Sequence, residues 1–166
     1  MAGQGTAALE LLEDAGPLDW LLAPVGGGGL LSGSSIAACA LAPEIRIVGV
    51  ETETSNDWQQ SWRAGERVRI PPPDTIADGM RTQQPGVLTF PVVRQLAHAI
   101  HTVSDQEVKT AMRFLLLRMK LLVEPTGAVP VALLLSGRLD LKGQRVGVIL
   151  SGGNADPSLI AEIVGP

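Results

Sequence analysis

Four consecutive glycines, Gly26, Gly27, Gly28 and Gly29, separate an apolar run from an Ala- and Leu-rich segment. Glycine has no Cβ, so a ligand can approach the backbone closely and successive N–H groups can surround an anion. A helix beginning here would add the positive end of its dipole. The run lacks the Gly-Lys-Ser/Thr ending of a P-loop, and Leu31 breaks the Gly-x-Gly-x-x-Gly spacing. A phosphate group is the expected guest, and a tight structural turn is the alternative.

Ser151 is a second candidate, because a hydroxyl follows the apolar run 145–150 and precedes Gly152, Gly153 and Asn154. In open parallel sheets, ligands bind beyond the carboxyl ends of the strands. We therefore expect Ser151 and the glycine run to face one pocket. Taken alone, the serine fits an ordinary turn equally well.

Glu51 and Asp57 form a third candidate, six residues apart and directly after the β-branched run 45–50. If the chain turns back between them, the two carboxylates can share a hard cation that prefers oxygen ligands, such as Mg²⁺ or Ca²⁺. A solvated acidic loop is the simpler alternative for this segment.

Strands and helices are expected to alternate around these candidates. The run 18–25, the glycine turn, the helix 30–41 and the strand 45–50 form a βαβ unit, which favours a parallel sheet. Ser104 and Glu107 have the spacing of a capping box at the start of a helix to about residue 120. Further helices are expected at 7–15, 90–99, 124–137 and from 157, with strands at 100–103 and 145–150. The fold class is therefore α/β, with one domain over residues 1–166.

Composition excludes several classes of protein. Of the 166 residues, 45% are hydrophobic and 18% charged, which suits a packed core. A net charge of −4 without a basic run makes nucleic acid an unexpected partner. The single cysteine excludes an internal disulfide and a cysteine-cluster metal site. Neither a signal peptide nor an apolar run long enough for a membrane span is found, so we expect a cytoplasmic protein with no membrane partner.

Six short stretches resemble, in order, the fold-type II pyridoxal-phosphate (PLP) enzymes, above all the branch of serine racemase, threonine dehydratase and serine dehydratase. They lie at residues 2–6, 24–30, 48–51, 76–79, 118–128 and 150–154, and include Pro-Val-Gly-Gly-Gly-Gly-Leu, Glu-Pro-Thr-Gly-Ala and Leu-Ser-Gly-Gly-Asn. The resemblance implies a parallel-sheet, three-layer αβα fold of the tryptophan synthase β type. Residues 1–166 would be the C-terminal part of its large, PLP-binding domain, without the N-terminal part and the small domain.

The resemblance also implies roles for the candidate residues. Gly26 to Gly29 would bind the PLP phosphate, and Ser151 would hydrogen-bond the pyridine nitrogen. A hydroxyl leaves that nitrogen largely unprotonated, which favours elimination of a β-hydroxyl. Gly79 would lie against the cofactor, with Glu124 near its ring. Glu51 and Asp57, with the Ser55 carbonyl, would match the Mg²⁺ or Ca²⁺ site of the racemase branch.

One departure from the family's pattern concerns the lysine that binds PLP covalently. The family's first half carries it in a Ser-x-Lys motif, but none of the three lysines here has that spacing to a serine. The resemblance therefore implies a C-terminal fragment of a serine/threonine ammonia-lyase, which acts on a small amino-acid substrate and is inactive alone. The alternatives are a serine racemase-type fragment, a non-catalytic phosphate- or PLP-binding module, or a truncated reading frame. Exposed apolar surface is expected to cause association, or the chain to form a homo-oligomer as the family does.

Overall fold

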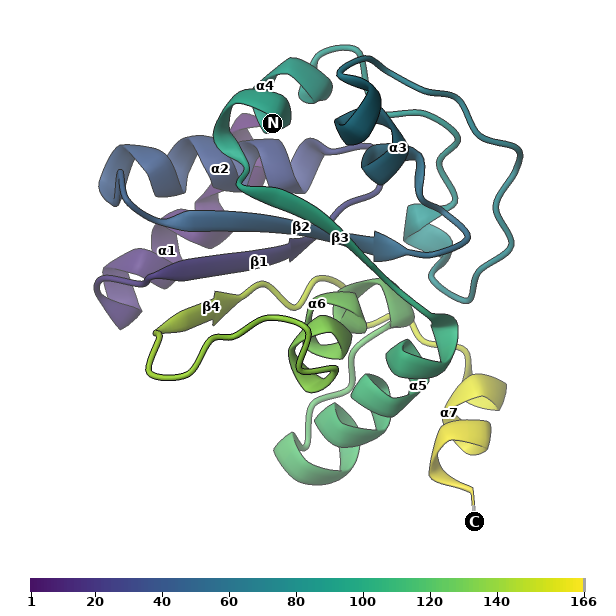
Figure 1. Cartoon of the computed structure of the whole chain (residues 1–166). Coiled ribbons are helices and arrows are strands. Elements are labelled where there is room, and N and C mark those ends of the chain that lie inside the picture. The colour runs from purple at the N-terminus through teal and green to yellow at the C-terminus, as the bar shows by residue number, and fades with distance from the viewer. Residues whose placement is uncertain (166) are drawn as a thin grey trace.

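A four-stranded parallel sheet forms the centre of the protein, as a computed structural model that describes residues 1–165 shows (Figure 1). The strand order is β3-β2-β1-β4, and every pair is parallel. The strands are β1 (Trp20–Pro24), β2 (Arg46–Thr52), β3 (Ala99–Val103) and β4 (Val146–Val148). The predicted parallel sheet is confirmed.

Helices cover both faces of this sheet, so the three-layer αβα prediction is confirmed as well (Figure 1). One face carries α1 (Thr6–Ala15), α2 (Gly29–Leu41) and α4 (Thr89–Leu96). The other carries α5 (Asp105–Phe114), α6 (Pro125–Leu135) and α7 (Pro157–Val164). The remaining helix α3 (Asp57–Ala64) and two 3₁₀ turns (Ala2–Gly5 and Asp78–Met80) complete the described elements, with a π-helical turn at Leu115–Met119.

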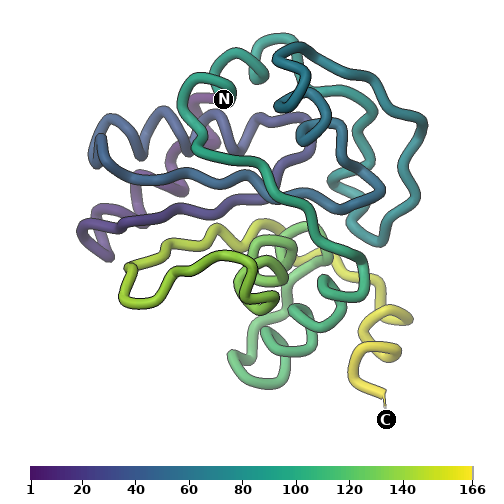
Figure 2. Tube along the Cα trace, in the orientation of Figure 1, coloured from purple at the N-terminus to yellow at the C-terminus, as the bar shows by residue number. Residues whose placement is uncertain are grey.

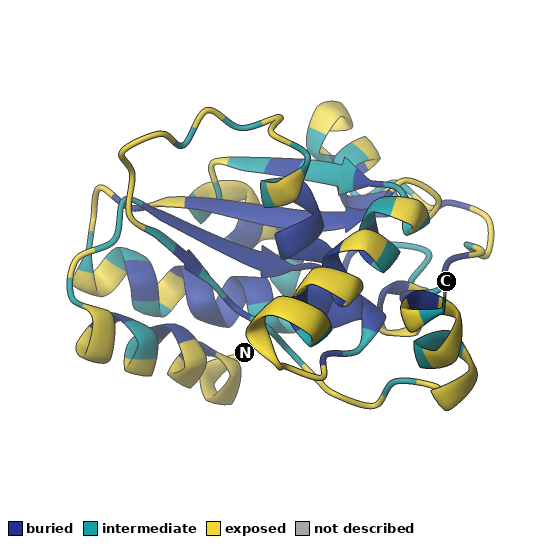
Figure 3. Cartoon of the chain, turned by 90° about the horizontal axis from the view of Figure 1, so that it is seen from below, coloured by how far each residue is buried: buried dark blue, intermediate teal, exposed yellow. Residues whose placement is uncertain are grey.

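Alternation along the strands divides the core in two, because successive side chains of a strand point to opposite faces. Leu21 and Ile47 pack with α1, α2 and α4, whereas Leu22, Val48 and Val50 pack with α5 and α6. Figure 3 shows the result, with buried strands between helices that are exposed on their outer sides. Within residues 1–165, no helix combines the length and the apolar character that crossing a membrane requires.

Three local expectations differ from the structure in detail. The helix expected at 7–15 begins one residue earlier, at Thr6, whose hydroxyl donates to the Gly3 carbonyl at 3.0 Å. The helix expected to run to Lys120 changes to a π turn at Leu115 and ends at Lys120 in the left-handed region (φ 62°). β4 is shorter than the run 145–150, because the ladder with β1 covers only three residues. The capping box of Ser104 and Glu107 is confirmed.

The carboxyl ends of the strands all point to one end of the sheet, as parallel pairing requires. The glycine run follows β1 there, and the segment 149–154 follows β4, the neighbour of β1. Figure 2 shows the long connection between α3 and α4 passing over this same end. Segments distant in the sequence therefore meet at one edge of the sheet.

Candidate functional site

A pocket of about 300 Å³ lies at this edge, and its wall contains every residue predicted to contact a cofactor. These residues are Gly26, Gly27, Gly28, Gly29, Gly79, Glu124 and Ser151, and Gln4, Pro24, Leu30 and Thr126 line the pocket with them. The glycine run and Ser151 come from the ends of adjacent strands, which explains why they share one cavity. A sheet that placed them on opposite faces would have excluded a common guest.

The carbonyl groups of Gly26, Gly27 and Gly28 accept hydrogen bonds from residues that do not line the pocket. The Trp58 indole N–H donates to the Gly26 carbonyl, and the Thr89 hydroxyl donates to the Gly27 carbonyl at 2.7 Å. The Gly28 carbonyl accepts from the backbone N–H of Ser32 at 2.9 Å and from its hydroxyl. Three successive carbonyl oxygens are thus engaged by groups that belong to other parts of the fold.

The amide N–H groups of the same loop differ from its carbonyl groups in their hydrogen bonding. In the described part of the chain, no protein acceptor is found for the N–H groups of residues 26–30. Gly28 caps α2 in the left-handed conformation (φ 88°), and the helix begins at Gly29. The dipole of α2 therefore adds positive potential to a row of free donors, and this donor set fits a phosphate group.

Glycines also let the pocket's walls approach each other. A Cβ on Gly26 would overlap the Gly79 carbonyl oxygen, and one on Gly79 would lie 2.9 Å from the Thr126 hydroxyl. The Gly79 N–H donates to that hydroxyl at 3.1 Å. A Cβ on Gly127 would overlap the Ser151 carbonyl oxygen. The walls of the pocket consequently consist of backbone segments in direct contact.

Glu124 and the turn after Ser151 are connected by two hydrogen bonds. Glu124 precedes α6, its N–H donates to the Gly152 carbonyl at 3.2 Å, and its carboxylate accepts from the Asn154 N–H at 3.2 Å. Gly152 has φ 76°, and a Cβ there would overlap the Glu124 carboxylate. The Ser151 hydroxyl has no hydrogen-bond partner within residues 1–165, so it is available to a guest. A neutral hydroxyl at this place suits a ring nitrogen that stays unprotonated.

The acidic candidates form a separate, buried cluster outside the pocket wall. The Glu51 carboxylate accepts from the N–H groups of Trp58 (3.2 Å) and Gln59 (2.7 Å) at the start of α3. Burial, the first cause, and the nearby Asp57 charge raise the pKa of Glu51 well above its usual value, although both hydrogen bonds oppose the rise. Burial likewise raises the pKa of Asp57 to about 7. Neither carboxylate belongs to any ion pair found in residues 1–165.

Ser55 lies between these two acids in the sequence and is 1% exposed. Its hydroxyl donates to the Met80 carbonyl, and its own carbonyl oxygen accepts no hydrogen bond from residues 1–165. Residues 1–165 hold no cluster of three or more His, Cys, Asp or Glu side chains suited to a metal. Two carboxyl groups and one carbonyl oxygen are nevertheless the ligand type of a hard cation, whose charge would favour the ionised form of both acids.

Besides Pro24 and Leu30, the polar residues Gln4 and Thr126 of the pocket wall were not predicted as site residues. Both lie in stretches that carry the family resemblance, at 2–6 and 118–128, so the signal was present. Their side chains reach the pocket because the first 3₁₀ turn packs on α2 and because Thr126 opens α6. Such contacts between distant segments are not visible in spacing along the chain.

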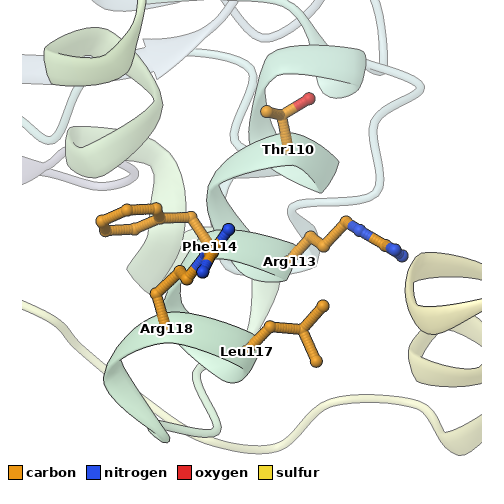
Figure 4. A pocket seen from close by; sticks show the side chains of 5 residues that line it. All are labelled: Thr110, Arg113, Phe114, Leu117 and Arg118. Atoms are coloured by element: carbon orange, nitrogen blue, oxygen red, sulfur yellow. The ribbon is translucent and has the colours of Figure 1, made fainter.

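A larger hollow of about 500 Å³ lies on the outer side of α5 and the π turn (Figure 4). Phe114 and Leu117 are more than a third exposed there, and Arg113 extends toward α7 (Figure 4). The Arg113 guanidinium donates to the carbonyls of Ile163 and Gly165, so this cation stabilises the position of α7. None of the candidate site residues lines this hollow.

The comparisons with known proteins agree with the pocket's chemistry. A family model described as "Pyridoxal-phosphate dependent enzyme" matches residues 1–152. The chain is 52% identical to L-threo-3-hydroxyaspartate ammonia-lyase of Saccharomyces cerevisiae, over 99% of this chain and 50% of that protein. It is 50% identical to serine racemase of Schizosaccharomyces pombe, over 94% of this chain and 48% of that protein.

A crystal structure of threonine deaminase from T.th. superposes with a TM-score of 0.87 at 46% identity, covering 93% of this chain and 56% of that one. The chain therefore spans about half the length of the curated relatives it matches. The family match covers more than half of the chain, and the parallel αβα fold is common to the superposed structure. The chain belongs to the family of pyridoxal-phosphate dependent enzymes.

Proposed function

We propose that this chain forms the cofactor-binding part of a PLP-dependent ammonia-lyase that acts on serine or threonine. One observation carries the proposal, namely a pocket with an amide cradle at one end and the Ser151 hydroxyl at the other. The relatives' names mention 3-hydroxyaspartate, serine and threonine. All three carry an amino group at Cα and a hydroxyl at Cβ, which defines a substrate class of β-hydroxy amino acids. Elimination of water, followed by hydrolysis that returns a water molecule and releases ammonia, converts such a substrate into a 2-oxo acid.

Different residues of the pocket bind different parts of the cofactor in this proposal. The N–H groups of residues 26–30 bind its phosphate, and Gly79 allows close approach to one side. Ser151 donates its hydroxyl hydrogen to the pyridine nitrogen without protonating it, while Glu124 fixes the turn that carries Ser151. Bound PLP supplies an electron sink for the bonds at Cα. With an uncharged nitrogen that sink is weaker, which favours prompt loss of the β-hydroxyl.

We propose further that the chain does not turn over substrate alone. No lysine of residues 1–165 lines the pocket. Lys109 pairs with Glu162 at 2.6 Å, and the Lys120 ammonium donates to the Leu117 carbonyl at 2.7 Å. A catalytic lysine must be placed and desolvated at the reacting atoms, which surface lysines are not. Reduction with borohydride after addition of PLP tests this point, because stoichiometric capture at one lysine would overturn it.

The cofactor assignment is tested by calorimetric titration of the chain with PLP. The Gly27→Asp variant is expected to abolish binding, since the side chain fills the cradle and its charge repels the phosphate. Gly27→Asn serves as the matched control, because it adds almost the same volume without the charge and should bind more tightly than the aspartate variant. Unchanged affinity in Gly27→Asp would show that the phosphate lies elsewhere.

We also propose that the carboxylates of Glu51 and Asp57 and the carbonyl of Ser55 bind Mg²⁺ or Ca²⁺. Supporting this are the burial of both acids, their raised pKa values and their lack of a cationic partner in the described chain. Addition of Ca²⁺ or Mg²⁺ should raise the melting temperature of the wild type and leave Asp57→Asn unaffected. An equal rise in both proteins would place the ion at another site.

A serine racemase-type parent is the second candidate, favoured by the 50% identity to the Schizosaccharomyces pombe racemase. Both reactions begin at the Cα–H bond, so the same pocket serves either one. The two activities can be distinguished in an assembled enzyme that contains this chain, by comparing the amounts of D-serine and of pyruvate formed from L-serine. Predominant D-serine would overturn the ammonia-lyase assignment.

Association through exposed apolar surface is also proposed. Phe114, Leu117, Met119, Leu121 and Leu122 are each 38% to 53% exposed within nine consecutive residues. An apolar run of this kind is a frequent site of contact with another polypeptide. Light scattering as a function of protein concentration tests the proposal, and a strictly monomeric mass would contradict it.

A further inference from the structure

We infer that Trp58 and Thr89 are positioning residues that turn the peptide groups of the glycine loop so that its N–H groups face the pocket. Neither residue lines the pocket, and neither has a role in the function proposed above. The inference rests on that proposed function only for the identity of the guest. The orientation of the loop itself is a property of the polypeptide.

In a planar trans peptide, the C=O of one residue and the N–H of the next point in opposite directions. Fixing the carbonyls of Gly26 and Gly27 on one side therefore directs the N–H groups of Gly27 and Gly28 to the other. The Gly28 carbonyl is already fixed by Ser32, which belongs to α2 itself.

Trp58 is well placed to fix the first of these carbonyls. It is 0% exposed, and its indole N–H donates to the Gly26 carbonyl oxygen. Its ring lies 5.9 Å from that of Phe90, centroid to centroid, and its own backbone N–H is held by the Glu51 carboxylate at 3.2 Å. Trp58 is thus held by packing of its ring, by the hydrogen bond of its indole and by a hydrogen bond of its backbone.

Thr89, the first residue of α4, fixes the second carbonyl. Its hydroxyl donates to the Gly27 carbonyl at 2.7 Å. The loop also rests on both side chains at Gly28, where an added Cβ would overlap the Trp58 ring and lie 2.7 Å from the Thr89 hydroxyl oxygen. The two residues come from different helices and contact the same side of the loop.

Without these contacts a run of four glycines would sample many backbone orientations. Binding of an anion would then have to order the loop, and that cost would weaken the affinity. One hydrogen bond of this kind changes an equilibrium by roughly threefold to tenfold. Loss of either donor is therefore expected to weaken binding of a phosphate group without altering any atom that touches it.

The decisive variants are Thr89→Val, which removes the hydroxyl while keeping the shape, and Thr89→Ser, which retains it. Thr89 is half-buried at the beginning of a helix, so both variants are expected to fold. Trp58→Phe removes the indole N–H and serves as the second test, with its unfolding transition measured first. If it fails to fold, the threonine pair alone decides.

The first readout needs no ligand, namely the ¹H–¹⁵N correlation peaks of the loop glycines in the intact chain. Thr89→Val is expected to shift or broaden the peaks of Gly27 and Gly28, and Thr89→Ser to leave them near the wild-type positions. Unchanged glycine peaks in Thr89→Val would overturn the inference, whatever the chain binds.

The second readout is the dissociation constant of PLP, with pyridoxal, which has no phosphate, as the control. Thr89→Val should weaken PLP about threefold to tenfold and leave pyridoxal unchanged, with recovery in Thr89→Ser. Equal weakening of both compounds, or none of PLP, would overturn the inference. A wild type that binds no PLP would instead refute the proposed function, while the glycine peaks would still decide the role of Thr89.

Discussion

Gly26 and Gly27 are adjacent in the loop, yet alanine is expected to have opposite effects at the two positions. A Cβ on Gly26 would overlap the backbone carbonyl of Gly79, whereas a Cβ on Gly27 would have no heavy atom within 4 Å. Neither glycine has a positive φ, so backbone strain does not contribute to the comparison. Comparing the two alanine variants therefore tests one effect, the close contact between the glycine loop and the segment of Gly79.

The expected changes in the free energy of unfolding follow from these contacts. Non-bonded carbon atoms pack at about 3.5 to 4.0 Å, so Gly26→Ala must push the loop away from the 3₁₀ turn that contains Gly79. Neither partner is a flexible side chain, and overpacking of this kind costs about 1 to 3 kcal/mol. Gly27→Ala reduces the freedom of the unfolded chain and is expected to be neutral or to stabilise by up to about 1 kcal/mol.

Urea unfolding of the three proteins, followed by tryptophan fluorescence, measures both effects. The midpoint of Gly26→Ala should fall, with an unchanged slope, while that of Gly27→Ala should not. Equal midpoints for the two variants would refute the reasoning, because they would show that the loop and the Gly79 segment are not in contact. A lower midpoint for Gly27→Ala alone would refute it as well.

Three further predictions concern other parts of the chain. Between pH 5 and 8 without divalent cations, Asp57 should lower the free energy of unfolding by about 2 to 3 kcal/mol, and Glu51 should add to this decrease. The pKa of both acids is raised, that of Asp57 to about 7, so the unfolded chain binds fewer protons over that range. Asp57→Asn should flatten this decrease in urea unfolding at the two pH values, and an equal decrease would contradict the assignment. Ser104→Ala should destabilise the protein by about 1 kcal/mol through loss of the capping box, whereas Ser104→Thr should retain most of the stability. Ser151→Ala should weaken PLP but not inorganic phosphate in calorimetry, and weakening of both would mean that the hydroxyl is not at the ring end of the pocket.

Much of the architecture could be predicted because local signals agreed with each other. The glycine run between an apolar strand and a small-residue helix predicted both the βαβ unit and the direction of α2. The capping box at Ser104 placed the beginning of α5 correctly. Because parallel strands end at one edge of a sheet, the order of these elements also predicted that Ser151 and the glycine run would share a cavity.

The remaining features depend on contacts between distant segments. Nothing in the sequence around Trp58 indicates its hydrogen bond to a carbonyl 32 residues earlier, because its spacing to Trp62 suggests only that both rings pack α3 onto the body. Nothing in the sequence indicated that Thr89 contacts the glycine loop, because a threonine at the start of a helix is common. The π turn after Phe114 was missed for a similar reason, as the apolar pattern of the helix continues through it.

The pocket wall draws on residues from position 4 to position 151, so a guest would add contacts between segments that are distant in the sequence. A ligand that binds only the folded state adds RT ln(1 + [L]/Kd) to stability, about 2.7 kcal/mol at one hundred times its dissociation constant. Occupation of the pocket would thereby contribute to the resistance of this polypeptide to proteases that attack its unfolded state.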